Sequence, residues 1–171
     1  MMNENTGDVF SEVLVKRKMV STNYLIVLAT VLGAAVLTLA LLLFLPTFIV
    51  VAIAIWFGVY FVISIQKVEY EYIFTSGDLD IDQISGNFKR KRKLELTGDS
   101  IEIIAPEDSH ELDSYRNGQY KVYDFSSRDK SKKRYVIIAN ISNGRVKVFF
   151  EPTEKMIDNM WKYSPRRVKK Y

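Results

Sequence analysis

Hydrophobic and polar positions divide the chain into two parts with different patterns. Between Met19 and Gln66 there is no Asp, Glu, Lys, Arg or His, whereas charged residues recur throughout the rest of the chain. One transmembrane helix needs about 20 apolar residues, so this stretch is long enough for two. Pro46 divides the stretch, because proline cannot continue a helix but is well placed at the start of the next one. The pattern predicts a transmembrane helical hairpin, with helices at 23–44 and 47–66 and a tight turn at Pro46.

Three further features of this stretch favour a membrane anchor. The alternative to a membrane anchor is a buried hairpin of a soluble protein. A cleaved signal peptide is not expected, because the stretch is longer than the ~7–15 apolar residues of a signal peptide. No ionisable residue lies inside either helix, and proton relays or ion pathways usually need one. Small side chains spaced for close helix packing are then the candidate contacts between helices. These are Ala29, Gly33, Ala54 and Gly58.

Basic residues flank the hairpin on both sides and none lies in its turn. Lys16, Arg17 and Lys18 come before it, and Lys67 follows it. Because positive charge favours the cytoplasmic side, both ends are expected in the cytoplasm. We therefore expect a multi-pass protein of the cell membrane, with two spans, both termini cytoplasmic and the lipid bilayer as its first partner.

The N-terminal segment, 1–22, has an apolar pattern of its own. Val9, Phe10, Val13 and Leu14 fall on one face of a helix with a period of 3.6 residues. An amphipathic helix over 8–18, with its basic end at the lipid headgroups, is one interpretation. A frayed cytoplasmic tail is the other.

Residues 67–164 alternate between apolar and polar positions, as half-buried strands do. Tyr70 and Tyr72 alternate with Glu69 and Glu71, and Asn143-Gly144 is the strongest short hairpin signal in the chain. An apolar stripe that includes Met156 and Met160 predicts a final helix that ends near Tyr163. Strands are expected in meander order at 68–75, 77–84, 87–97, 100–105, 119–126, 132–141 and 144–150.

This arrangement resembles the pleckstrin-homology-like (PH-like) fold. The resemblance depends on the run Tyr70-Glu71-Tyr72-Ile73-Phe74-Thr75-Ser76-Gly77-Asp78-Leu79-Asp80-Ile81-Asp82, on the basic strand at 89–93 and on Glu151-Pro152 before the last helix. With two preceding spans, the chain looks like the bacterial membrane-anchored PH-like proteins, a family of small two-span membrane proteins. The resemblance implies an α+β membrane protein, in which a transmembrane α-hairpin precedes a seven-stranded antiparallel β-sandwich or barrel capped by a C-terminal helix. A small β-barrel of another type is the alternative fold.

The five basic residues at 89–93 have two interpretations. A two-residue turn at Ser85-Gly86 would set Lys89, Lys91 and Lys93 opposite Asp82, Asp80 and Asp78, where each opposite pair contributes roughly 0.2–1 kcal/mol. The lysines then form a self-neutralising ladder rather than a nucleic-acid or lipid site. The same register places Arg90 and Arg92 on the apolar face beside Leu79 and Ile81. They are either exposed at a splayed edge or contact an anionic lipid or a partner carboxylate.

The net charge of +4 lies beyond residue 66, because three acidic and three basic residues precede that point. The basic C-terminal tail, 165–171, is therefore a candidate contact for anionic lipid or a partner, and a solvated end is the alternative. No nucleic acid is expected, because the charge excess is small. The candidate residues of the tail are Arg166, Arg167, Lys169 and Lys170.

Catalytic and metal chemistry find little support in the sequence. The chain has no cysteine, and its single histidine, His110, lies in an acidic turn without a partner motif. Residues 126–133 are predicted to form a mobile hairpin loop, which is either a recognition loop or a solvated connector. We expect no cofactor, no metal and no enzyme. The sequence favours a non-catalytic binding or scaffolding module for a protein partner or a second copy. An accessory subunit of a membrane transport or envelope complex, assembled through its helices, is the alternative.

Overall fold

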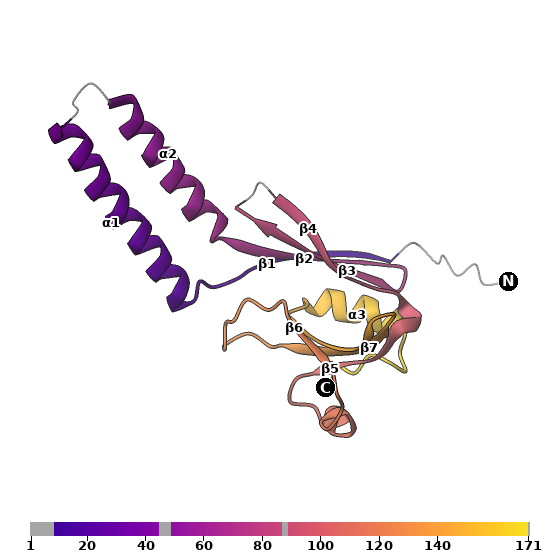
Figure 1. The fold of residues 1–171 in the computed structure, drawn as a ribbon. Helices are drawn as coiled ribbons and strands as arrows, with labels where there is room; N and C mark the ends of the chain where they lie inside the picture. Colours follow the sequence, from indigo (N-terminus) through magenta and orange to yellow (C-terminus); the bar gives the residue numbers. More distant parts are fainter. Residues whose placement is uncertain (1–8, 45–48, 87–88, 171) are drawn as a thin grey trace. The chain divides into compact units, whose positions relative to one another are not determined.

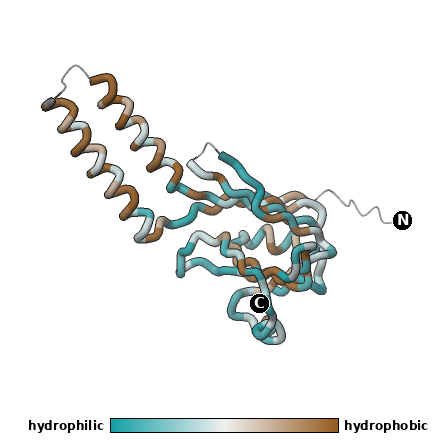
Figure 2. Tube along the Cα trace, in the orientation of Figure 1, coloured by the Kyte–Doolittle hydropathy of each residue, from teal (hydrophilic) through white to brown (hydrophobic). Residues whose placement is uncertain are grey.

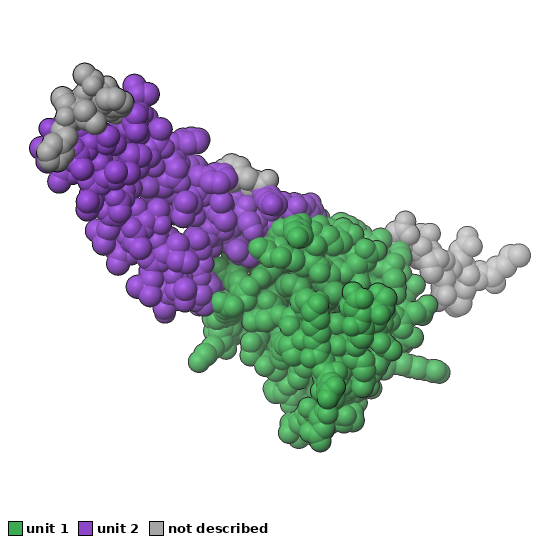
Figure 3. Space-filling view, in the orientation of Figure 1, with its two compact units in different colours: residues 1–17, 69–83, 91–171 green, residues 18–68, 84–90 purple. Residues whose placement is uncertain are grey.

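The computed structural model describes residues 9–44, 49–86 and 89–170. The chain divides into two compact units, which Figure 3 colours separately. The β unit comprises residues 1–17, 69–83 and 91–171, and the helical unit comprises residues 18–68 and 84–90.

The helical unit contains two apolar helices, α1 (Ser21–Phe44) and α2 (Ile49–Ile65). Figure 2 shows hydrophobic residues along the whole length of both. Among the described residues, one helix is long and apolar enough to cross a membrane, over Ser21–Leu43, with a mean hydropathy of 2.7. The 17 residues of α2 form a shorter apolar helix. The turn predicted at Pro46 lies outside the described residues.

The first sheet of the fold has the strand order β1-β2-β3-β4. Its strands are β1 (Phe10–Lys16), β2 (Val68–Thr75), β3 (Asp78–Ser85) and β4 (Lys89–Leu96). Ser76 and Gly77 join β2 to β3, and both have a positive φ, as in a type I′ hairpin turn.

The strand β1 overturns the prediction of an amphipathic helix before the hairpin. It pairs antiparallel with β2, from Phe10 opposite Thr75 to Lys16 opposite Glu69. Residues at alternate positions of this segment face the core, and Val15 is 5% exposed. A strand is favoured because pairing with β2 satisfies the backbone and buries this face, and neither benefit is visible in the local pattern.

The second sheet has the order β5-β7-β8-β6. Its strands are β5 (Ile101–Pro106), β6 (Lys121–Asp124), β7 (Tyr135–Ile141) and β8 (Gly144–Phe150). The prediction of a simple meander is wrong here, because β6 pairs in parallel with β8 instead of antiparallel with β7. Short 3₁₀ helices, η2 (Gly98–Ser100) and η3 (His110–Tyr115), flank β5.

The core of the β unit lies between the two sheets and the final helix, α3 (Glu154–Tyr163). Thr153 caps α3, since its side chain accepts a hydrogen bond from the Met156 N–H at 3.3 Å. The apolar face of α3 is buried, as its sequence predicts, and Figure 1 shows the helix against the strands. Two sheets and a terminal helix agree with the expected α+β, PH-like class.

Candidate functional site

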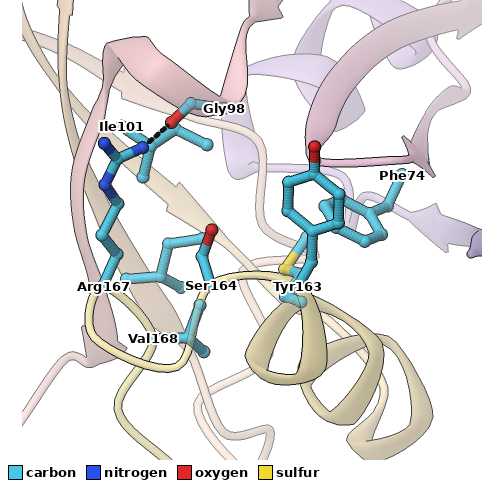
Figure 4. Close-up of a pocket in the computed structure, with 10 residues that line it drawn as sticks. Phe74, Gly98, Ile101, Tyr163, Ser164, Arg167 and Val168 are labelled. Atoms are coloured by element: carbon cyan, nitrogen blue, oxygen red, sulfur yellow. Dashed lines mark hydrogen bonds between the residues drawn. The ribbon is translucent and has the colours of Figure 1, made fainter. Parts of the chain in front are cut away.

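A small cavity lies where the C-terminal end of α3 meets both sheets. Figure 4 shows Tyr163 beside Phe74 on one wall, and Arg167 donating a hydrogen bond to the Gly98 carbonyl on the other. The cavity volume is about 10 Å³, which is room for about one water molecule. The cavity is therefore too small for a ligand. The residues around it pack α3 and the end of the chain against the sheets.

The residues predicted as a basic tail are part of this packing. Val168 is 3% exposed and forms a parallel bridge with Ile104 of β5. The Ile104 N–H donates to the Arg167 carbonyl, and the Lys169 N–H donates to the Ile104 carbonyl, both at 2.8 Å. The interpretation of a solvated end is therefore wrong, because β5 leaves an open edge that this segment covers.

The side chains of the tail contact acidic groups of the same unit. Lys170 Nζ lies 2.5 Å from Asp158 Oδ1 and 4.4 Å from the centre of the Trp161 ring. Lys169 Nζ lies 3.5 Å from Glu111 Oε1. Arg167 lies 3.9 Å from Asp99, and Arg166 is exposed. Of the four predicted contacts, Arg166 has no ion pair with the described residues.

A larger hollow runs beside β1, and we call it the β1 groove. Residues 13–15 of β1 form one wall, and Lys132 and Lys133 with residues 151–155 form the other. Its volume is about 580 Å³, within the range of small-ligand sites. A second hollow of about 350 Å³ adjoins it, shares Lys133, and continues along α3 to Asp158.

Exposed lysines give the far wall of the β1 groove a positive charge. Lys132, Lys133 and Lys155 are exposed, and none has a carboxylate within ion-pair distance among the described residues. Lys133 Nζ instead lies 5.7 Å from the centre of the Tyr135 ring. Glu154 is the exposed carboxylate of the same wall.

Buried hydrogen bonds fix the floor of this wall. Glu151 is 5% exposed, and its Oε1 accepts hydrogen bonds from the N–H and the hydroxyl of Ser127, each at 2.9 Å. The Tyr72 hydroxyl donates to the Phe125 carbonyl at 2.7 Å and accepts from the Glu151 N–H at 3.4 Å. Burial raises the pKa of Tyr72 well above its ordinary value, so the hydroxyl keeps its proton. Glu151 Oε2 is buried without a hydrogen-bond partner among the described residues.

The structure corrects one part of the prediction of a mobile hairpin loop at 126–133, namely that the loop joins neighbouring strands. Ser126 and Ser127 are almost completely buried, and β6 and β7, on either side of the loop, are not neighbours in the sheet. Sequence reasoning missed Tyr72, Ser127 and Glu151 as a group. The one signal was a glutamate directly after the apolar strand β8, where burial requires a partner.

The contacts of β4 with β3 differ from those of the predicted lysine ladder. Arg92 lies 2.8 Å from Asp80 and 2.9 Å from Asp82, so arginine rather than lysine contacts these two aspartates. The Arg92 side chain is 47% exposed, so it is not buried with Leu79 and Ile81. Arg90 is exposed on the same strand.

The small residues predicted to pack the helices do not lie between α1 and α2. Ala29, Gly33, Ala54 and Gly58 are exposed, and a Cβ added at either glycine would meet nothing within 4 Å among the described residues. The buried positions are Ala34 on α1 and Ala52 and Val59 on α2.

The single histidine lies on the surface. The His110 side chain is 99% exposed, and its Nδ1 lies 3.4 Å from Asp113 Oδ2 within η3. Within residues 9–44, 49–86 and 89–170, no group of three or more histidine or acidic side chains is placed to hold a metal ion.

Comparison with known proteins agrees with this architecture. A sequence profile of the family described as Bacterial PH-like domain (DUF6106) matches residues 7–170. The match covers β1, both apolar helices and both sheets, so it is not confined to the β unit. Neither a curated protein nor a solved structure gives a significant match. The chain belongs to the bacterial PH-like domain family DUF6106.

Proposed function

We propose that the protein is anchored in the cell membrane by a two-helix hairpin and that its PH-like domain is a non-catalytic binding or scaffolding module at the inner membrane surface. The observation that carries the anchor is the place of α1 and α2 in the chain. They follow β1 and precede β2, two strands that are antiparallel neighbours up to the pair Lys16–Glu69.

This connectivity constrains how the helices cross a bilayer. The chain enters α1 and leaves α2 at the same end of one strand pair, so both helix ends must lie on one side of the membrane. If α1 crosses, the chain must cross back before β2, and α2 is the described apolar helix available for it. At this end, the Asn23 side chain in the first turn of α1 donates a hydrogen bond of 2.6 Å to the side chain of Gln66, the residue directly after α2.

The surface of both helices supports a lipid environment. Large apolar side chains are exposed along α1 and α2, for example Val36 at 69% and Phe57 at 72%. Soluble monomers rarely expose continuous apolar surface of this size. The 17 residues of α2 give a helix of about 26 Å, at the short end of the lengths that span a hydrocarbon core.

Charge next to the helices supports the cytoplasmic orientation. Lys16, Arg17 and Lys18 precede α1, and Lys67 follows α2. Membrane proteins retain such residues on the cytoplasmic side. In this orientation the β unit, whose chain runs directly into α1 and directly out of α2, lies in the cytoplasm.

The binding role is supported by the family and by the β1 groove. PH-like domains are generally non-catalytic binding modules. The β1 groove is large enough for a ligand and has an exposed basic wall. A partner held there would be held next to the membrane by the anchor.

The cysteine-free sequence allows a direct test. Single cysteines at Ser142, in the β7–β8 turn, and at Thr47, between the helices, are labelled in intact cells with a membrane-impermeant maleimide. The proposal expects labelling at position 47 before permeabilisation and at position 142 only afterwards, with the protein retained in membranes after alkaline carbonate washing. Release by carbonate, or equal labelling of both sites in intact cells, would overturn the topology.

The binding role needs its own experiment. Crosslinking and affinity purification from native membranes should recover a specific protein partner or a second copy, and recovery of monomer alone would contradict it.

A second function, an accessory subunit of a membrane complex, is favoured by the open glycine positions. Gly33 and Gly58 leave space that a helix of another protein could approach closely. Replacing both with leucine should then disrupt the complex in native gels, whereas Val36→Leu, at another exposed position of α1, should not. Normal assembly of the double variant would remove this alternative.

A further inference from the structure

We propose that the β1 groove binds an extended acidic segment of a partner protein as an additional strand beside β1. The inference rests on the proposed binding function and specifies its site and the chemistry of the partner. β1 is the end strand of its sheet, so within the part of the chain that the structure describes no strand pairs with its other side.

The hydrogen bonds of β1 show which of its backbone groups are open. The Ser76 N–H donates to the Val9 carbonyl at 3.1 Å, and this pair continues the register of β1 with β2. Residues of an antiparallel strand alternate between bonding to one side and to the other. Val13 and Val15 therefore bond towards β2, and Leu14 directs its N–H and carbonyl away from β2.

The shape of the groove fits this geometry. Three consecutive residues, 13–15, line it, whereas the face of a sheet would present alternate residues. Leu14 is at the centre of this wall and its side chain is 49% exposed. Such an unprotected strand edge is a template for strand addition, which gives main-chain hydrogen bonds to a partner.

The opposite wall determines the charge of the partner. Lys132, Lys133 and Lys155 share this wall with one exposed carboxylate, Glu154, so the groove favours a segment with acidic side chains. Complementary charge of this kind increases both the specificity and the association rate.

The wall is held in place before any partner binds. Ser127 and Glu151 are joined by two buried hydrogen bonds, and this contact ties the 126–133 segment to the end of β8. A rigid wall reduces the entropy lost on binding.

The test uses the full chain in nanodiscs of zwitterionic lipid and two fluorescein-labelled peptides of about eight residues. One peptide alternates glutamate with valine and the other alternates lysine with valine. We expect the acidic peptide to bind with a Kd of about 10–100 µM and the basic peptide to bind at least about tenfold more weakly. Hydrogen exchange should slow at the Leu14 amide when the acidic peptide is bound. Equal binding of both peptides, or no slowing at Leu14, would overturn the proposal.

Matched variants separate the groove from general charge effects. Lys133→Glu should weaken the acidic peptide about tenfold, whereas Lys130→Glu, an exposed lysine of the same loop outside the groove, should change it less than about twofold. Leu14→Pro should abolish binding while the fold is retained, because proline is accepted on an edge strand whose N–H faces outward. Equal effects of the two lysine variants would contradict the proposed site.

Two further outcomes separate this inference from the proposed function. If a partner is recovered from native membranes equally by the wild type and by Lys133→Glu, the scaffold function stands and the groove proposal fails. If nanodiscs with anionic lipid protect residues 132–133 from exchange without peptide and block the peptide, the groove is a lipid site and the proposal also fails. Recovery of no partner at all contradicts the proposed function itself.

Discussion

Removing residues 165–171 should destabilise the β unit strongly, although their composition is that of a solvated basic tail. The truncation exposes the site of Val168, whose burial contributes about 1.5–3 kcal/mol. It also removes the two backbone hydrogen bonds of Ile104, each worth about 1 kcal/mol. The expected loss in the free energy of unfolding is about 4 kcal/mol.

Urea unfolding followed by tryptophan fluorescence measures this loss. The chain has two tryptophans, so a Trp56→Phe background leaves Trp161 of α3 as the reporter of the β unit. With a denaturant dependence of about 2 kcal/mol per molar urea, the midpoint should fall by about 2 M. Hydrogen exchange at the Ile104 amide should accelerate in the same variant.

Two point variants test the same packing with smaller expected losses of stability. Val168→Ala removes two methyl groups from a buried site and should lower stability by about 2 kcal/mol. Arg166→Gln removes an exposed charge of the same segment and should change stability by less than about 0.5 kcal/mol. A truncated protein whose midpoint stays within about 0.3 M of the parent would refute the packing role of this segment.

Three other predictions concern the turns and the charged strand pair. In urea unfolding, Gly77→Ala should lower stability more than Gly144→Ala. Both glycines have a positive φ, but of the two only Gly77 would have its added Cβ within 3 Å of a tyrosine ring. Equal losses of stability in the two variants would contradict this. Arg92→Glu should destabilise by about 2 kcal/mol, because it removes the ion pairs with the half-buried Asp80 and the buried Asp82 and sets a negative charge beside them. Lys91→Glu should have little effect, and the reverse order would support the lysine ladder predicted from the sequence. Burial raises the pKa of Asp80 despite its ion pair with Arg92, so the folded state holds this proton more tightly than the unfolded state. The stability of the wild type relative to the Asp80→Asn variant should therefore fall as the pH rises above about 4. Urea midpoints measured at pH 4–7 test this, and a wild-type midpoint that rises relative to that of the variant would refute it.

Local pattern was sufficient for elements whose neighbours lie nearby in the chain. The strand predicted at 68–75 coincides with β2, the strand at 144–150 coincides with β8, and the final helix ends at Tyr163 as expected. Alternation and turn residues determine these elements, because a hairpin partner or an amphipathic face is encoded within a few residues.

The missed elements depend on partners far away in sequence. β1 is a strand because β2, beyond both helices, satisfies its backbone. β6 pairs in parallel with β8, which lies between β6 and β7 in the sheet. The β1 groove joins three such distant segments. The contact of Ser127 with Glu151 likewise requires the completed fold. Periodicity contains no information on these pairings, so the candidate site could not be predicted from it.

The division of the first sheet around the helices has a consequence for biogenesis. β1 is synthesised before α1 and α2, but its partner β2 emerges only after both. In the proposed topology, β1 can pair with β2 only after the second helix has returned the chain to the cytoplasm. If only one helix crossed the membrane, β1 and β2 would lie on opposite sides of the bilayer and could not pair. The β1–β2 ladder would therefore form only in chains in which both helices have crossed the membrane.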